Sequence, residues 1–421
     1  MLRASNVNLK TTPVRNHKPI EIMTQNVSQP QPLVKSQVAL VRCDSYEPAR
    51  VAAAIRRGID LLGGIEKFAQ SGERIVLKPN LLSAHPPEEN VTTHPTVIKA
   101  IAEIMLENGV KVFIGDSATR GHLAKILRES GMQTVIDELN LPIADFENGK
   151  QVYSPDSVRN KNFTIARGVW ESDGIFNVPK LKTHHLTRIT AAIKNLFGCV
   201  PGFLKPALHV ALPAVDDFCR MLVDLSIFLK PRLTILDAIE AMEGNGPSSG
   251  NAYPLKLLAF SSDLVAIDSL VCRMMAIKPE YVRTNYWGAQ AGLGKINLEE
   301  IEILGDGLDT FSAPDFKVQR QPDLRFNQAW QYRHLKGLVT NRPVIDAQKC
   351  KKCGDCIDQC PQQPKALSWN GKMKTQPPQF DYKLCIRCFC CQEVCPHKAI
   401  DSYTPLLRRI VDKVYTNIYG A

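Results

Sequence analysis

Eight cysteines near the C-terminus repeat one spacing twice. Residues 350–361 read C-x2-C-x2-C-x3-C-P, and residues 385–396 read the same. Three closely spaced thiolates can wrap one [4Fe–4S] cube, and in two-cluster ferredoxins the fourth ligand comes from the opposite run. The spacing therefore predicts two [4Fe–4S] clusters. We expect one cluster to be held by Cys350, Cys353, Cys356 and Cys395, and the other by Cys385, Cys388, Cys391 and Cys360.

Zinc is the main alternative ligand for these cysteines, because C-x-x-C steps also bind zinc. A zinc site does not account for a third cysteine in step and a following Cys-Pro in both runs, so we rank it well below the clusters. Disulfides would suit an oxidising compartment and rank lower still. Cys390 falls outside the spacing. We interpret it as a small buried residue beside a cluster rather than a ligand.

A second set of candidate residues lies in the segment 178–209, which is rich in lysine and histidine. Lysines beside a helix N-terminus favour the binding of a carboxylate or phosphate group. Histidine can transfer protons near neutral pH. A solvated basic face is the alternative, but Lys194 lies within an apolar helical pattern, where a free lysine would need a partner. For proton transfer and catalysis we select Lys182, His184, His185 and Lys194, and for ligand binding Lys180, Thr183, Asn195, Lys205 and His209.

A third group of polar residues follows earlier apolar segments. Lys78 and Asn80 are predicted to bind ligand, and His94 to join the proton-transfer set. Asp116 could bind a hydroxyl or orient a base, although a strand-end cap explains it equally well. Thr93 could also belong to this group, although a role as helix N-cap explains it equally well. The glycine-rich segment 244–250 is not GxGxxG, and we interpret it as a tight turn or a gating loop rather than a nucleotide loop.

Short apolar runs alternate with helical patterns from Val38 onward, which indicates an α/β fold with a mostly parallel, doubly wound sheet. Ligands bind such sheets at the carboxyl ends of the strands, where the polar groups above fall. Asp263 and Asp268 flank the start of one helix, where one is expected to cap it and the other to pair with a basic residue. Strands are predicted at 38–43, 74–80, 110–117, 174–182, 232–239 and 255–263, and helices at 47–63, 94–109, 119–131 and 264–277.

The chain divides into five segments by composition. We predict a disordered extension over 1–36, a large α/β domain over 37–310, a basic linker over 311–343, a small α+β bacterial-ferredoxin-like domain over 344–401, and an amphipathic helix over 402–421. The linker could dock an acidic partner or nucleic acid, but a solvated linker is favoured. We expect the C-terminal helix to pack against the protein, with a membrane-surface helix as the alternative.

Composition narrows the class of protein. The formal net charge is +10, 44% of residues are hydrophobic and 22% are charged, as in a globular protein. The sequence contains no run of about 18 apolar residues, which a transmembrane helix would need. Its N-terminus does not resemble a secretory signal. The four cysteines outside the runs are scattered, which with the clusters favours the cytoplasm. Walker A, HExxH, GxSxG and clear nucleic-acid motifs are all absent from the sequence.

The ordered motifs KPNLL, TTHP, IGDS, PKLKTHHLTRITAAIKNLFG, EGNGPSSG and SSDLVAIDSL closely resemble the family known as domain of unknown function 362. The resemblance covers about residues 38–306. The run CIRCFCCQEVCP is similar to that of family members with a C-terminal two-cluster ferredoxin module. The resemblance implies an iron–sulfur protein of redox function. It implies no established reaction and no catalytic residue.

Two functional hypotheses follow. The first is a ferredoxin-type oxidoreductase whose clusters pass electrons to an anionic small-molecule substrate or a cofactor in the large domain. The second is a non-catalytic electron carrier or assembly subunit that docks a redox partner protein. An iron–sulfur sensor has less support, because the sequence contains no DNA-binding motif.

Overall fold

The computed structural model describes residues 35–117, 123–322, 336–371 and 374–419. The predicted extension over 1–36 lies outside the described residues except for its last two positions. The first residues of the helix predicted at 119–131 also lie outside them. The described part starting at Lys35 forms one compact unit.

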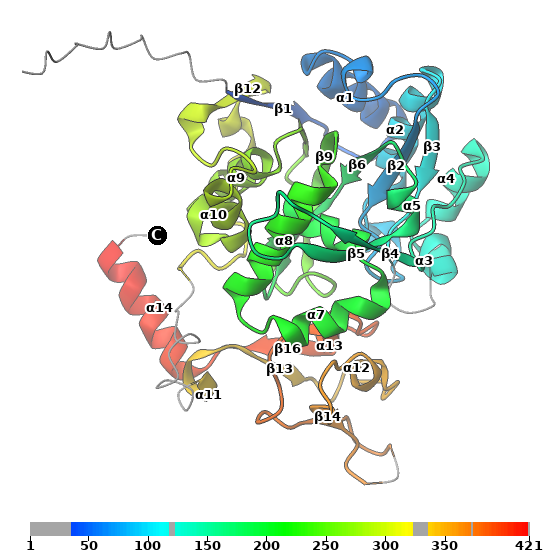
Figure 1. Cartoon of the computed structure of the whole chain (residues 1–421). Helices are drawn as coiled ribbons and strands as arrows, with labels where there is room; N and C mark the ends of the chain where they lie inside the picture. The colour runs from blue at the N-terminus through cyan, green and yellow to red at the C-terminus, as the bar shows by residue number, and fades with distance from the viewer. Residues whose placement is uncertain (1–34, 118–122, 323–335, 372–373, 420–421) are drawn as a thin grey trace, which may run out of the picture. The chain divides into compact units, whose positions relative to one another are not determined.

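A ten-stranded sheet forms the centre of the large domain (Figure 1). Parallel pairing joins β1 to β12, β2 to β3 and β6, and β9 to β6 and β7, while β11 runs antiparallel to β1 and β9. The predicted mostly parallel sheet is therefore confirmed. Its main strands run in the order β12 (Ile301–Gly305), β1 (Ser36–Arg42), β11 (Leu257–Ser261), β9 (Leu233–Glu243), β6 (Gly174–Val178), β2 (Arg74–Pro79) and β3 (Lys111–Ile114). The strands β7 (Lys180–His184), β8 (Arg188–Thr190) and β10 (Asn251–Tyr253) extend the sheet at β9.

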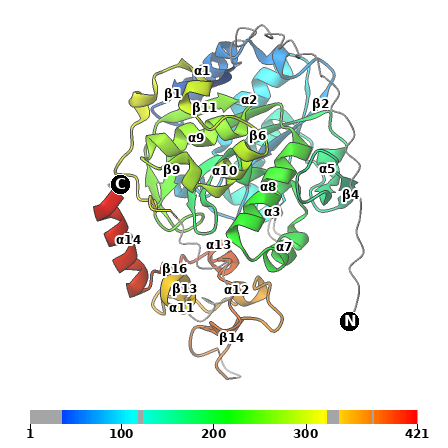
Figure 2. The ribbon, with the colours of Figure 1, turned by 60° about the vertical axis from the view of Figure 1, so that its left-hand side comes forward.

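Helices cover both faces of this sheet, as a doubly wound fold requires (Figure 2). In β1, Val38 and Leu40 enter one buried core, whereas Ala39 and Val41 enter the other. This alternation follows from the two-residue period of a strand. The core containing Ala39 is closed by α1 (Pro48–Leu61), α2 (Pro95–Glu107), α3 (Leu123–Glu129) and α4 (Met132–Leu139). The other core is closed by α8 (Val215–Leu229) and α9 (Leu264–Met274), and α10 (Arg283–Gln290) packs against both of these helices.

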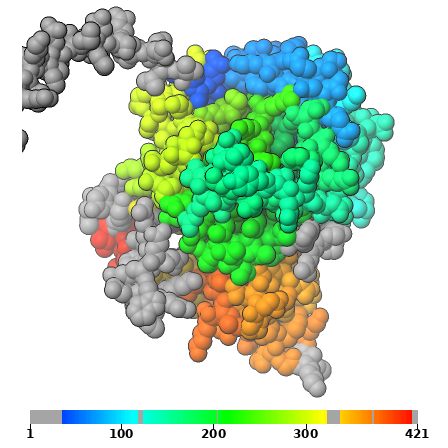
Figure 3. Space-filling view, in the orientation of Figure 1, coloured from blue at the N-terminus to red at the C-terminus, as the bar shows by residue number. Residues whose placement is uncertain are grey.

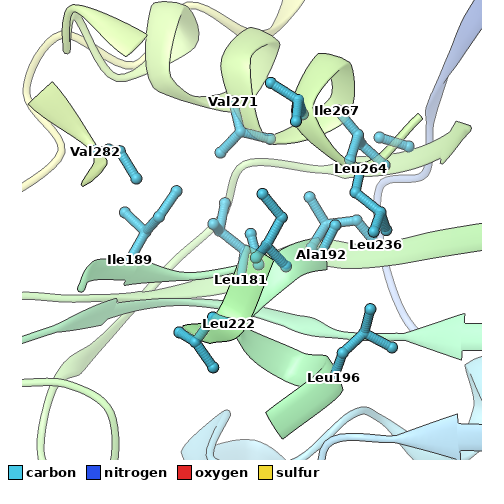
Figure 4. Close-up of a cluster of buried hydrophobic side chains, with 14 of the residues drawn as sticks. Leu181, Ile189, Ala192, Leu196, Leu222, Leu236, Leu264, Ile267, Val271 and Val282 are labelled. Atoms are coloured by element: carbon cyan, nitrogen blue, oxygen red, sulfur yellow. The ribbon is translucent and has the colours of Figure 1, made fainter. Parts of the chain in front are cut away.

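The core around α9 shows how an apolar helix face packs on the sheet. Leu264, Ile267 and Val271 point from α9 towards Leu236 of β9 and Leu181 of β7 (Figure 4). All five side chains are at most 2% exposed. Their burial fixes β7, and so the residues that follow it, against the rest of the domain.

The boundaries of several elements differ from those predicted. The single strand expected over 174–182 is divided into β6 and β7. The division falls at Pro179, which has no backbone N–H to donate to a neighbouring strand. The strand predicted at 110–117 ends at Ile114. The predictions contained no counterpart of α4, α8, α10, β8, β10 and β12, of the hairpin of β4 (Gly149–Tyr153) and β5 (Asn162–Ala166), or of the short helices α5 (Arg167–Trp170) and α7 (Lys205–Ala211). The short helix α6 (Ala192–Asn195) falls within the helical pattern predicted around Lys194.

The C-terminal part forms a small α+β domain. β13 (Arg342–Ile345) pairs with β16 (Ile400–Tyr403), and β14 (Leu367–Ser368) with β15 (Gln379–Phe380). The short helices α12 (Asp355–Asp358) and α13 (Cys390–Glu393) each lie within one cysteine run. Before this domain comes α11 (Lys336–Val339), and after it α14 (Leu406–Tyr419). Figure 3 shows its surface next to that of α7.

Candidate functional site

Cysteines from opposite runs meet in the small domain. One cavity is lined by Cys350, Cys353 and Cys356 of the first run and Cys395 of the second. Around Cys385, burial raises the thiol pKa, and the neighbouring Cys388 and Cys360 raise it further. The backbone N–H groups of Ala366 and Ala399 each donate to the sulfur of a Cys-Pro cysteine, at 3.4 Å. Cys391 completes the second group, since burial raises the pKa of its thiol and the nearby Cys388, Cys385 and Cys360 raise it further. Each group of four thiols, with an N–H donor beside it, fits a [4Fe–4S] cube.

A second cavity lies between the large domain and this small domain. Its empty space is about 770 Å³, part of it open to solvent. The large domain contributes residues at the carboxyl ends of β2, β3 and β7 and from α6 and α7, as the sheet rule predicts. The small domain contributes residues beside cluster cysteines. The charged and polar lining consists of Asn80, Asp116, Ser117, Lys182, His184, Thr190, Lys194, Asn195, Lys205 and His209, with Gln359, Cys390 and Glu393 from the small domain.

A buried ion pair forms the floor of this arrangement. The Lys78 ammonium lies 2.8 Å from Asp116 Oδ1. Asp116 also accepts hydrogen bonds from the backbone N–H groups of Leu81 and Ser117, at 2.7 and 2.8 Å. A Cβ atom at Gly198 would overlap both partners of the ion pair, so only glycine fits there. Lys78 and Asp116 are therefore engaged with each other and do not face a ligand as free groups.

An amide network continues from this pair to the cavity wall. Asn195 accepts from Lys78 at 3.3 Å and from Asn80 at 3.0 Å. Asn80 in turn accepts from the ammonium of Lys182 at 2.8 Å. Lys182 also donates to the Val91 carbonyl, at 2.7 Å. The network fixes these side chains before any ligand binds.

Three lysines give the cavity its positive charge. Burial lowers the pKa of Lys182 to about 7 and that of Lys205 to about 8, and it also lowers the pKa of Lys194. Lys205 donates to the Ser117 carbonyl at 2.8 Å. No side chain or carbonyl of the described residues accepts a hydrogen bond from Lys194, whose ammonium lies 5.0 Å from the centre of the Phe197 ring. The Ser117 hydroxyl is likewise buried without a hydrogen-bond partner in the described part of the chain.

The two histidines of the cavity differ in their partners. His184 Nδ1 accepts from the backbone N–H groups of Leu186 and Thr187, and Nε2 lies 3.1 Å from Glu393 Oε1. His209 stacks on Phe218, with ring centroids 4.5 Å apart. Within the described residues, neither ring nitrogen of His209 has a hydrogen-bond partner. Both residues are 5% exposed, and burial lowers the pKa of each ring to about 4.

Besides Lys78, four of the predicted site residues do not line this cavity. His94 is the N-cap of α2, where Nδ1 accepts from Thr96, and its ring stacks on Tyr46 at 3.7 Å. Lys180 is fully buried and pairs with Asp237 at 3.2 Å. The pairing of β7 with β9 shifts register between Lys180 and Lys182, so the two lysines have different neighbours. The expectation that these groups share one site with Lys182 is therefore corrected for His94 and Lys180.

The other two, Thr183 and His185, lie beside the contact between the two domains. Thr183 donates to the Gly244 carbonyl and accepts from Gly246, both at 3.0 Å. His185 lies 2.9 Å from Asn245 Oδ1, and its ring stacks on Phe389 of the small domain. His185 lines a different cavity, beside Arg387 and Phe389. Thr183 thus supports the loop 244–250 and His185 contacts the small domain, so the structure does not place either residue in the cavity.

The glycine-rich loop 244–250 is the main contact with the small domain. Asn245 donates to Asp401 at 2.6 Å, and Ser248 to the Gln392 carbonyl at 3.1 Å. Gln392 returns a hydrogen bond to the Asn245 carbonyl at 2.8 Å. The loop thus places the second cysteine run against the cavity. The loop is the turn that joins β9 to β10, in keeping with the predicted tight turn, and it also docks the small domain.

Several residues beside the cavity or its supporting contacts were not predicted from the sequence. Glu393 and Gln392 lie inside a cysteine run, and the spacing of that run predicts a role for its cysteines alone. Asp268 accepts from the N–H groups of Ala192 and Ile193, at 2.7 and 3.2 Å, instead of pairing with a base, while Asp263 caps α9 as one of the two was expected to do. Burial raises the pKa of Asp268 to about 7. Cys390 is buried in the cavity wall, as predicted for a non-ligand.

Both parts of the chain resemble known proteins. Residues 75–273 match the model of a domain of unknown function, DUF362, and residues 342–396 match a 4Fe-4S dicluster domain. A thylakoid-associated protein of Synechocystis sp. is 36% identical over 263 residues, which cover 62% of this chain and 80% of that protein. The chain belongs to the DUF362 family. This DUF362 protein carries an iron–sulfur electron-transfer domain with two [4Fe–4S] clusters.

The dicluster domain of the DUF362 protein has separate relatives. Pyruvate synthase subunit PorD of Methanocaldococcus jannaschii is 38% identical over 61 residues, 14% of this chain and 65% of that protein. A ferredoxin of Pyrobaculum islandicum is 41% identical over 59 residues, 14% of this chain and 50% of that protein. The chain thus spans about half to two thirds of each of these two relatives.

Solved structures give weaker likenesses. The lactate racemase apoprotein from Thermoanaerobacterium thermosaccharolyticum aligns with a TM-score of 0.36 and 14% identity, covering 56% of each chain. In the described part of the DUF362 protein, no three His, Cys, Asp or Glu side chains are grouped to hold a single metal ion. None of its described helices is long and apolar enough to span a membrane.

Proposed function

We propose that this DUF362 protein is an iron–sulfur redox protein that exchanges electrons with a small anionic ligand bound in the cavity between its two domains. The observation that carries this proposal is the shared cavity wall. Lysines of the large domain face Cys390 and Gln359, the direct neighbours of the proposed cluster ligands Cys391 and Cys360. When bound, the clusters supply one-electron transfer. Electron transfer weakens steeply with distance, so a ligand here would be well placed.

An anion is the ligand class that the charges favour. No carboxylate or carbonyl of the described residues is in direct contact with the ammonium of Lys194, and burial lowers its pKa. Lys194 is half-buried, and a bound anion would give its ammonium a partner and favour the charged form. Lys205 and the unpartnered Ser117 hydroxyl lie in the same wall. A carboxylate or phosphate group could therefore bind between Lys194, Lys205 and Ser117.

His209 is the residue we assign to proton exchange with the ligand. Both nitrogens of His184 are already engaged, by two backbone N–H groups and by Glu393. His209 lines the same cavity and keeps its ring nitrogens available there. A reduction that places negative charge on the ligand would raise the proton affinity of the neighbouring imidazole. His209 is thus a better choice than His94, His184 or His185.

The electrons come from, or go to, a redox partner protein. The buried thiols of Cys43, Cys199, Cys219 and Cys272 and the clusters both need a reducing compartment, so we place the protein in the cytoplasm. We also assign the cluster ligands as the sequence predicted, across the two runs.

The anion site is tested with malonate, a small dicarboxylate, on anaerobically reconstituted holo-protein. Calorimetry would measure malonate binding, and EPR of the reduced clusters would report a change close to them. We expect Lys194→Gln to weaken malonate binding about tenfold, because one cation contact is lost. The control Lys230→Gln removes an exposed lysine, paired with Asp156, outside the cavity. Equal malonate binding by wild type and Lys194→Gln would refute the site.

A non-catalytic carrier is the second candidate, because one relative of the dicluster domain is named as a subunit of pyruvate synthase. The same preparation separates the two candidates. Mass spectrometry of small molecules released from the purified holo-protein would reveal an anionic ligand if the first candidate holds. A stable protein partner, with no released ligand and no malonate binding, would favour the carrier.

A further inference from the structure

The C-terminal segment concentrates the exposed apolar surface of the protein. Of the twelve large apolar side chains that the described part of the chain exposes, six lie between residues 338 and 414. Single exposed apolar residues are common, but a gathered set marks an interaction site. We call this set the C-terminal apolar patch. It consists of Leu338, Tyr403, Leu406, Leu407, Ile410 and Val414.

The patch follows one side of α14. Successive residues of an α-helix are turned by about 100°, so Leu406, Ile410 and Val414 form a stripe with Leu407 beside it. Leu406 is 68% exposed, and Ile410 and Val414 are each 50% exposed. On the neighbouring element α11, which contacts α14, Leu338 is 52% exposed. The stripe therefore faces solvent over two turns and continues onto a second element.

The polar side of α14 is turned towards the protein. Arg408 is only 8% exposed and pairs with Asp412 at 2.7 Å. An ordinary surface helix has the opposite arrangement, with its apolar side inward and its charges in water. The packing of α14 thus leaves its apolar side for another surface.

The charges at the border of the stripe are positive. Arg409 and Lys413 are exposed and lie along one edge of the stripe. The one carboxylate among the described side chains of α14, Asp412, lies on the inner side with Arg408. Arg409 is anchored at this edge by a hydrogen bond from Nε to the Thr404 carbonyl, at 3.0 Å. An apolar stripe bordered by cations complements a surface that is apolar inside and anionic outside.

We propose that α14 and Leu338 bind the surface of an anionic lipid bilayer. The stripe enters the boundary between headgroups and acyl chains, and Arg409 and Lys413 reach the lipid phosphates. Anionic leaflets attract such cations over about a Debye length. A second copy of this chain fits less well, because it brings the same cations together with no carboxylate on that side of α14 to neutralise them. Since α14 begins three residues after β16, this surface holds the dicluster domain next to the membrane.

Vesicle flotation of the full-length holo-protein tests this proposal. We expect the protein to float with vesicles of phosphatidylcholine and phosphatidylglycerol, to stay unbound with phosphatidylcholine alone, and to be released by high salt. The double variant Leu406→Gln/Ile410→Gln should bind at least tenfold less, with unchanged iron content. Arg409→Gln/Lys413→Gln should lose the preference for phosphatidylglycerol. Leu106→Gln, a lone exposed leucine on α2, is the control and should bind as wild type does.

Three results would overturn the proposal. The first is the absence of flotation with either vesicle. The second is equal flotation of wild type and the leucine–isoleucine variant. The third is a dimer, detected by light scattering, that this variant dissociates, since the patch would then be an interface between two copies.

Discussion

His184 and Glu393 join the two domains through a hydrogen bond, with Nε2 and Oε1 3.1 Å apart. Because Nδ1 of His184 accepts from two backbone N–H groups, the ring hydrogen belongs on Nε2 and is donated to Glu393. Burial keeps His184 neutral by lowering its pKa to about 4. Burial alone would raise the pKa of Glu393, but the His184 hydrogen bond and the Lys194 charge outweigh it and hold the pKa at about 2. A neutral donor therefore faces an ionised acceptor across the domain boundary.

This pair predicts that acid destabilises the protein. Unfolded His184 takes up a proton as pH falls through about 6.5, while folded His184 stays neutral down to about 4. The unfolded state thus binds more protons in this window, so the free energy of unfolding falls with pH. The contribution of Glu393 is lost at lower pH, from about 4.5 towards 2.

Anaerobic guanidinium denaturation at pH 6.5 and 4.5 would measure this effect. We expect His184→Gln to reduce the loss of unfolding free energy between these two pH values by about 2 kcal/mol, because each unit of pKa difference corresponds to about 1.4 kcal/mol. The other buried histidines continue to contribute in the variant, so some pH dependence should stay. An unchanged slope would contradict the proposed state of His184.

The lysines of the cavity predict that anion binding weakens in alkali. A lysine is charged below its pKa, and burial lowers the pKa values of Lys182 and Lys205 to about 7 and about 8. Malonate keeps its two charges across this range, so only the protein loses charge. We expect malonate affinity to fall several-fold between pH 6.5 and 9, as measured by calorimetry. The variant Lys205→Gln should show a shallower fall, and a flat wild-type profile would exclude a charge-based site.

The exchange of ligands between the cysteine runs can be tested with double variants. Cys350→Ser/Cys395→Ser removes two ligands of the same proposed cluster, so about four irons per chain should remain. Cys350→Ser/Cys360→Ser removes one ligand from each proposed cluster and should lower the iron content further. If each run instead held its own cube, the two variants would exchange their results. Anaerobic iron and sulfide analysis with EPR distinguishes the outcomes.

Gly198 predicts a strong effect from adding a single methyl group. Its Cβ would overlap the carboxylate of Asp116 and the ammonium of Lys78, which form a buried ion pair. Breaking such a pair typically costs about 3–5 kcal/mol. Gly198→Ala should therefore lower the thermal unfolding midpoint by several degrees or more. Gly307→Ala is the matched control, since its Cβ would meet no atom within 4 Å; equal midpoints for both variants would contradict the packing at Gly198.

The sheet could be predicted because its strands are buried on both faces and read as continuous apolar runs, such as residues 38–41. Element boundaries were less predictable. Pro179 divides one apolar run between two strands, and this division depends on which neighbouring strand accepts the pairing. The helix α8 also escaped prediction, although its buried face packs against the same core as Leu236.

The site could be predicted only in its residue types. Lysines and histidines at strand ends indicated an anionic ligand, and Lys182, Lys194, Lys205 and His209 do line one cavity. His94 and Lys180 have the same residue types and similar positions in the sequence, yet their partners are Tyr46 and Asp237. Side-chain partners depend on distant segments, which local sequence does not specify.

The sequence alone determined the chemistry of the cysteines, because thiolate number and spacing follow directly from the chain. It also determined the α/β class, through the period of its apolar residues. Only the tertiary structure decided that Glu393 and Cys390 of the dicluster domain close a cavity on the lysines of the large domain. That cavity depends on contacts between residues some 150 to 200 positions apart, such as Asn245 with Gln392 and His184 with Glu393. Contacts at such separation form only when the whole chain has folded.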